Sequence, residues 1–151
     1  MMIRIFITAV LYLISLLTQA QGNSSQEKQL VDEASFAIEV MIGQMKSDEG
    51  TVYFGLYASE KDFANRNYMQ GKKVKADKDG VVVSFENIPK GVYAISCFYD
   101  ANDNGKMDFD PNGMPLEEYG ATNNVMNFGP PRFSDAKFEV SDKDLTFEIR
   151  F

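Results

Sequence analysis

Hydrophobic and polar residues alternate along most of the chain, a period of two that is typical of β-strands with one buried face. In residues 36–42 and 52–57, aliphatic or aromatic side chains occupy every second position. Residues 73–75 place two lysines around Val74, a composition typical of an exposed edge strand. The same alternation predicts further strands at 81–85, 92–99, 138–140 and 145–151.

Between these runs lie short segments that predict turns. Ser59 followed by Asp62 is typical of a helix start and predicts a single helical turn through residue 65. Asp79-Gly80 is a hairpin signal leading into the strand at 81–85, and residues 87–91 (NIPKG) form a second turn.

The run at 92–99 is apolar on both faces and therefore belongs in the middle of a sheet that is covered on both sides. With six or seven strands, almost no helix and short turns, the chain is predicted to be all-β. We expect a single antiparallel β-sandwich over residues 35–151, with one long loop from residue 100 to about residue 135.

The N-terminus has the pattern of a secretory signal peptide. Arg4 precedes an apolar run from residue 5 to residue 17, and small residues stand before a plausible cleavage point after Ala20. The run is short for a membrane-spanning helix, although an uncleaved anchor is the alternative. We expect residues 1–20 to be removed, 21–34 to form a flexible leader, and the mature protein to be periplasmic or extracellular without stable membrane insertion.

The composition limits the kinds of functional site that the chain can form. The 151 residues include no His and one Cys, which argues against a zinc site, an internal disulfide and histidine-based catalysis. That residue, Cys97, lies in an alternating apolar stretch, so we expect a buried, unreactive thiol. The net charge of −7 argues against nucleic-acid binding, which needs a basic surface. Four lysines at 72, 73, 75 and 78 form a basic patch that we interpret as a solvated edge strand.

The long loop carries the one motif with a defined chemistry. Residues 100–108 read D-x-N-x-N-G-x-x-D, the first nine positions of an EF-hand-type calcium loop. Alternate oxygens can then converge on a hard cation, with a backbone carbonyl after the glycine as a further ligand. The predicted ligands are Asp100, Asn102, Asn104, Lys106 through its carbonyl, and Asp108.

The motif also departs from the EF-hand. Position twelve is Pro111 instead of a bidentate Glu, and a strand precedes the loop. The missing carboxylate could come from Asp110, Glu117 or Glu118, and spacing does not choose among them. The alternative is a solvated turn without a metal, since Asn and Asp favour such turns through bonds to their own backbone.

Four motifs in order resemble a family of uncharacterised bacterial exported proteins. They are FENIPKGVYAI at 85–95, DANDNGKMD at 100–108, YGATNN at 119–124 and FGPPRFSDA at 128–136. The resemblance extends from about residue 36 to residue 151. It implies an all-β, immunoglobulin-like or transthyretin-like sandwich, and it implies no enzyme activity.

We therefore expect a non-catalytic exported module, monomeric, whose long loop is organised by a weak calcium site and which binds a protein or glycan of the cell envelope. The alternative is a small carboxylate-dependent, calcium-assisted hydrolase acting on polysaccharide. Against the hydrolase stand the absence of His and of a nucleophile motif.

Overall fold

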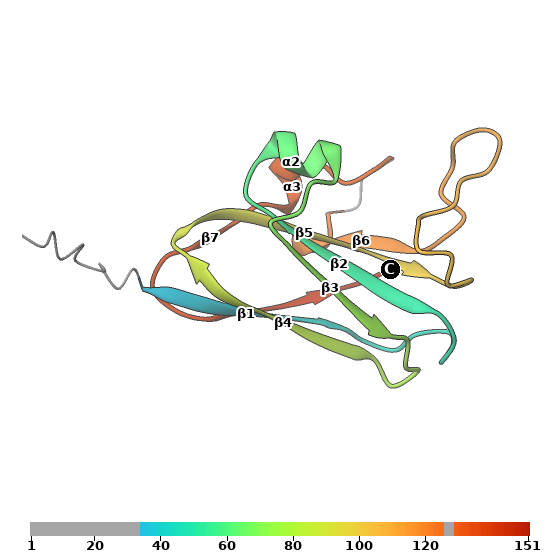
Figure 1. Ribbon diagram of the computed structural model, residues 1–151, viewed down its shortest axis with the longest axis horizontal. Coiled ribbons are helices and arrows are strands. Elements are labelled where there is room, and N and C mark those ends of the chain that lie inside the picture. The colour runs from blue at the N-terminus through green and yellow to red at the C-terminus, as the bar shows by residue number, and fades with distance from the viewer. Residues whose placement is uncertain (1–33, 126–128) are drawn as a thin grey trace, which may run out of the picture. The chain divides into compact units, whose positions relative to one another are not determined.

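The computed structural model describes residues 34–125 and 129–151 (Figure 1). The predicted signal peptide and nearly all of the predicted leader lie outside these residues. The described part contains the strands β1 (Ser35–Ile42), β2 (Thr51–Tyr57), β3 (Gln70–Lys75), β4 (Val81–Pro89), β5 (Gly91–Asp100), β6 (Tyr119–Ala121), β7 (Phe138–Val140) and β8 (Leu145–Ile149). Its helices are α2 (Glu60–Asn65), the 3₁₀ turn η1 (Thr122–Asn124) and α3 (Phe133–Ala136).

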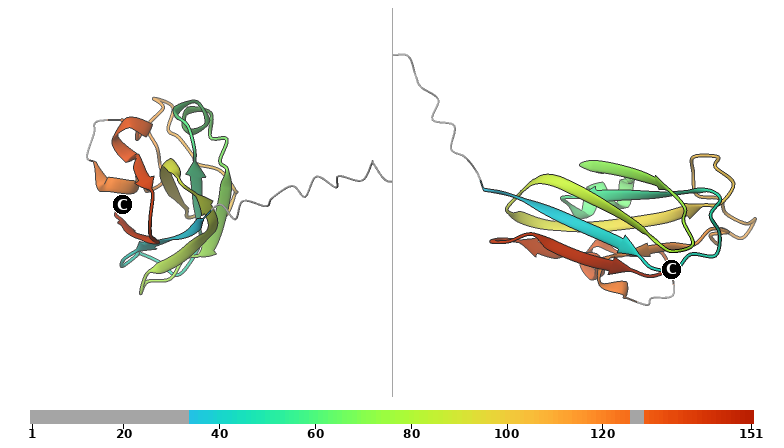
Figure 2. Two further views of the ribbon diagram at one scale, coloured as in Figure 1. Left: turned by 90° about the vertical axis from the view of Figure 1, so that its left-hand side faces the viewer. Right: turned by 90° about the horizontal axis from the view of Figure 1, so that it is seen from below.

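The strands form two sheets, so the chain is mostly β as the sequence predicts (Figures 1 and 2). One sheet has the order β4-β1-β8. The other has the order β3-β2-β5-β6, and β7 pairs with β5 as its fifth strand. The main core cluster draws its side chains from strands of both sheets, and Phe85 and Ile95 are among its large members with no exposed surface.

The prediction of a wholly antiparallel arrangement is wrong at one place, because β1 and β8 run parallel. A parallel pair needs a long connection between its strands, and here nearly the whole domain lies between Ile42 and Leu145. The alternation of apolar residues is the same in both kinds of pair, so it carries no information about direction.

The prediction of a hairpin at Asp79-Gly80 is also wrong, although the turn itself is present. The N–H of Gly80 donates to the carbonyl of Asp77 at 2.9 Å, and Gly80 has a φ of +106°. The strands on either side, β3 and β4, belong to different sheets. The Asp79-Gly80 pattern predicts that the chain turns, but it does not predict which sheet the next strand joins.

Strand β5 lies in the middle of its sheet, as predicted, but its second face is covered only in part. Tyr93 and Ile95 point into the main core. On the other face, Ala94 is fully buried in a small cluster against which Phe63 of α2 and Phe133 of α3 pack. This second layer covers β5 at Ala94 but not at Val92, which is 47% exposed, so the prediction of a strand covered on both faces is wrong at that end.

Other local predictions are confirmed. Helix α2 begins after Ser59, whose hydroxyl accepts the N–H of Asp62 at 3.1 Å. The lysine-rich strand β3 lies at an edge of its sheet. Cys97 is buried, and that burial raises the pKa of its thiol, which keeps the thiol unreactive.

No helix in the described ranges is long and apolar enough to cross a membrane.

Candidate metal centre

The segment between β5 and β6, residues 101–118, is a hairpin-like loop that projects beyond the strands (Figure 1). Its two arms are joined by backbone hydrogen bonds from Leu116 to Asp108 and from Asp110 to Met114, each 2.9 Å long. Phe109 and Pro115 form a bridge between the arms. The candidate ligands are therefore held on a defined backbone.

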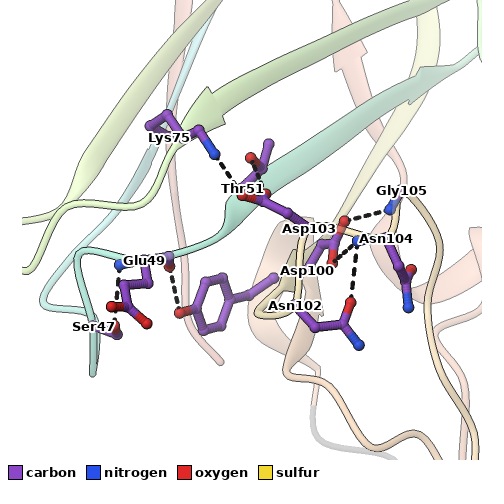
Figure 3. A network of polar contacts seen from close by, with 10 residues as sticks. Ser47, Glu49, Thr51, Lys75, Asp100, Asn102, Asp103, Asn104 and Gly105 are labelled. Carbon is purple, nitrogen blue, oxygen red and sulfur yellow. Dashed lines mark hydrogen bonds and ion pairs between the residues drawn. The ribbon is translucent and has the colours of Figure 1, made fainter.

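Asp100, the first predicted ligand, is the last residue of β5 and has no exposed surface. Its two carboxylate oxygens accept the backbone N–H groups of Asn104 at 3.1 Å and Gly105 at 2.7 Å (Figure 3). Gly105 has a φ of +81°, so the glycine allows the chain to fold back over the carboxylate. The loop closes around a buried negative group.

Three further predicted ligands gather in one network. The side-chain amides of Asn102 and Asn104 both donate to Oδ2 of Asp108, at 2.8 and 2.6 Å. Two N–H donors thus converge on one carboxylate oxygen of Asp108. A cation bound to this oxygen would take the place of the two donors. The spacing in the sequence correctly indicates that these side chains meet.

The amide oxygens also hold the loop backbone. Oδ1 of Asn102 accepts the N–H of Asn104 at 3.1 Å, and Oδ1 of Asn104 accepts the N–H of Lys106 at 3.0 Å. These are the Asx turns of the alternative interpretation. Each amide oxygen has a second lone pair, so the turns leave it able to bind a cation.

The structure distinguishes among the three acids that spacing could not separate. Glu117 accepts the N–H of Ala101 at 3.2 Å and the N–H of Asp108 at 3.1 Å, so it lies across the base of the loop. Asp110 instead accepts the N–H groups of Asn112 and Met114 within its own turn. Glu118 is ion-paired with Lys46.

Sequence reasoning missed a contact that ties the loop to the sheet. Lys75 of β3 donates to Asp103 at 2.6 Å, and the hydroxyl of Thr51 donates to the other oxygen at 2.6 Å (Figure 3). The Lys75 ammonium and the Thr51 hydroxyl hold the pKa of Asp103 below its usual value. No local pattern indicates this contact, because the partners come from three different segments.

The candidate ligands offer the type of atom that calcium binds, but few of them carry a negative charge. Every candidate ligand supplies oxygen, which is what a hard cation requires. However, the described residues contain no group of three or more Asp, Glu, Cys or His side chains placed to hold a metal ion. A calcium ion here would depend on Asn oxygens and the Lys106 carbonyl in addition to Asp100 and Asp108.

A family model described as "Uncharacterized protein conserved in bacteria (DUF2141)" matches residues 40–148, which is most of the chain. The chain belongs to this family. The DUF2141 match includes the whole loop and nearly all of both sheets, and it confirms the resemblance to an uncharacterised bacterial family. No curated protein and no solved structure matches the chain.

Proposed function

We propose that this DUF2141 protein is a non-catalytic, exported binding module whose long loop is ordered by a weakly bound calcium ion. Its two sheets would then be a β-sandwich of the immunoglobulin-like or transthyretin-like kind, a class in which loops at the ends of the strands commonly carry binding sites. Export to the periplasm or beyond rests on the N-terminal sequence pattern.

The observation that carries the cation proposal is the environment of Asp100. Its carboxylate is completely buried, and among the described residues it takes part in no ion pair. Two backbone N–H groups satisfy it in part. A buried carboxylate is costly unless it is paired or coordinates a metal, so a cation at this position would offset the cost.

The small number of charged ligands predicts weak binding. Extracellular calcium modules with few carboxylates have dissociation constants of ~10⁻⁴–10⁻³ M. At calcium concentrations between one and ten times that constant, binding stabilises a protein by ~0.4–1.4 kcal/mol. Calcium would thus order the loop without being required for folding.

The hydrolase alternative needs two carboxyl groups across a concave cleft. A hollow of about 260 Å³ contains Glu118 and Glu148 among its lining residues. Glu118 is ion-paired with Lys46, and Glu148 with Arg150. Carboxylates that are tied to cations in this way favour a structural role, so we propose the module and keep the hydrolase as a prediction from the sequence.

The test is thermal unfolding of the purified protein in millimolar calcium and in chelator. We expect calcium to raise the melting temperature by about 2–6 °C, which follows from the weak linkage and the size of the domain. Asp100→Ala should abolish the rise, as should Asp108→Asn if the first variant folds poorly. Asp142→Ala, which changes an exposed acid outside the loop, should retain it. If calcium leaves the melting temperature of the wild-type protein unchanged, the cation proposal is wrong.

A further inference from the structure

The outer face of the five-stranded sheet carries a row of side chains at one register. Lys73 of β3 is paired with Tyr53 of β2, Tyr53 with Phe98 of β5, and Phe98 with Tyr119 of β6. The rings of Tyr53 and Phe98 are stacked, with centroids 5.1 Å apart and planes 8° from parallel. Phe98 therefore covers the side of the Tyr53 ring that faces β5.

The opposite side of the Tyr53 ring faces β3, where the surface is hollowed. A hollow of about 320 Å³ is lined by Tyr53, Thr51, Lys73, Val74 and Lys75. Tyr53 is half-buried, so part of its ring remains exposed and forms an aromatic wall of the hollow. A concave site with one aromatic wall and a few polar groups is the usual form of a small-ligand site.

The charge at this hollow is opposite to that of the protein. The chain has a net charge of −7, yet both charged residues of the lining are lysines. Lys75 is engaged with Asp103 of the loop. Lys73 is exposed, and across the described ranges it takes part in no ion pair, so its ammonium is available to an anion.

We propose that this hollow binds an acidic glycan. A hexuronate ring would place its apolar C–H face against the exposed part of the Tyr53 ring, and its carboxylate would accept a hydrogen bond from the ammonium of Lys73. This names a ligand class for the module proposed above and rests on that function. It does not require calcium, because neither Tyr53 nor Lys73 belongs to the candidate metal centre.

Size and charge favour a glycan over other partners. The hollow is lined by five residues, which is a much smaller surface than a stable protein–protein interface needs. Such an interface buries about 800 Å² on each partner. The hollow itself has one lysine outside an ion pair, which does not match the multiple phosphate contacts that nucleic acids require. One sugar ring with one carboxylate matches both the exposed part of the Tyr53 ring and the Lys73 ammonium.

The experiment is a calorimetric titration of the full chain, in chelator, with short oligomers of galacturonate, of mannuronate and guluronate, and of hyaluronan. A neutral galactose oligomer is the comparison ligand. We expect at least one acidic oligomer to bind and the neutral one to bind at least about tenfold more weakly, the factor that one charge-assisted contact supplies.

Variants locate the site. Tyr53→Leu and Lys73→Gln should each weaken binding about tenfold or more, while Lys90→Gln, which removes an exposed lysine from the turn after β4, should leave it unchanged. The proposal is overturned if no acidic oligomer binds, or if binding survives both hollow variants. A calcium titration without sugar is run in parallel, so that loss of the cation site and loss of the glycan site give different results.

Discussion

Two glycines are required for different physical reasons. Gly105 has a φ of +81°, and a Cβ placed there would meet only the Tyr53 hydroxyl, at 4.0 Å. Gly120 lies on β6, where a Cβ would stand 2.6 Å from Ile149 Cγ2 and 2.8 Å from the Arg150 carbonyl. The first glycine provides a backbone conformation, and the second allows β6 to approach the end of β8.

Substitution should separate these two roles. Gly105→Ala is expected to cost about 1–2 kcal/mol, and Gly105→Asn less, because Asn tolerates the left-handed conformation. Gly120→Ala is expected to cost about 1–3 kcal/mol through overpacking, and Gly120→Asn more than that. Urea unfolding measures all four variants. The same order of Ala and Asn at both positions would contradict this explanation.

At the scale of single residues, the sequence predicts which side chains meet when the residues are close along the chain. Asp100, Asn102, Asn104 and Asp108 meet in one network because spacing within nine residues limits where they can go. The contacts of Glu117 with the backbone of Ala101 and Asp108 were not predictable. Its position depends on how the two arms of the loop pair, and the sequence does not encode that pairing as a local pattern.

At the scale of elements, the loop between β1 and β2 is bound to the loop between β3 and β4 by hydrogen bonds and an ion pair. The loop between β1 and β2 contributes Asp48, which accepts the backbone N–H of Lys78 at 2.8 Å and its ammonium at 2.9 Å. The N–H of Met45 also donates to the carbonyl of Lys78, at 3.2 Å. Lys78 lies between β3 and β4, so these contacts fix the crossing from one sheet to the other.

This contact predicts a pH dependence of stability. The bonds from Lys78 lower the pKa of Asp48 below its ordinary value of 3.8. In the unfolded chain Asp48 takes up a proton first as the pH falls, so its contribution is complete above about pH 4 and is lost below it. We expect the free energy of unfolding, measured with urea between pH 6 and about pH 2.5, to fall less steeply in Asp48→Asn.

The control variant is Asp142→Asn. In the wild type, the carboxylate of Asp142 accepts a hydrogen bond from the neighbouring Ser141 hydroxyl. It should not change the acid dependence in the way that Asp48→Asn does. Equal slopes for the wild type and Asp48→Asn would show that the Lys78 contact contributes nothing in solution.

The main strands and α2 were predictable, whereas β6, η1 and α3, which fall in the predicted long loop, and the pairing of the strands were not. Alternation of apolar residues correctly predicts the main strands, and Ser59 correctly predicts the start of α2. The sequence did not predict that β8 pairs parallel with β1 or that β3 and β4 separate into two sheets. Those features depend on contacts between residues far apart in the chain, which local periods do not report.

At the scale of the whole molecule, the acidic residues are not evenly spread. Six of the 22 Asp and Glu residues fall between Asp100 and Glu118, at the projecting end of the five-stranded sheet. The lysine-lined hollow beside Tyr53 lies on the same sheet, and Lys75 joins it to the loop through Asp103. The proposed cation site and the proposed glycan site are therefore neighbours that share one ion pair.

The most direct test of the calcium-ordered loop is an NMR titration of ¹⁵N-labelled protein with calcium up to about 10 mM, well above the expected dissociation constant. We expect saturable shifts in the side-chain amide signals of Asn102 and Asn104, which must leave Asp108 when a cation binds, and in the backbone N–H of Gly105. Signals from β1 and β4 should remain in place. If the Asn102 and Asn104 amides do not move, or if shifts spread evenly over surface acids such as Asp142, the loop does not bind calcium.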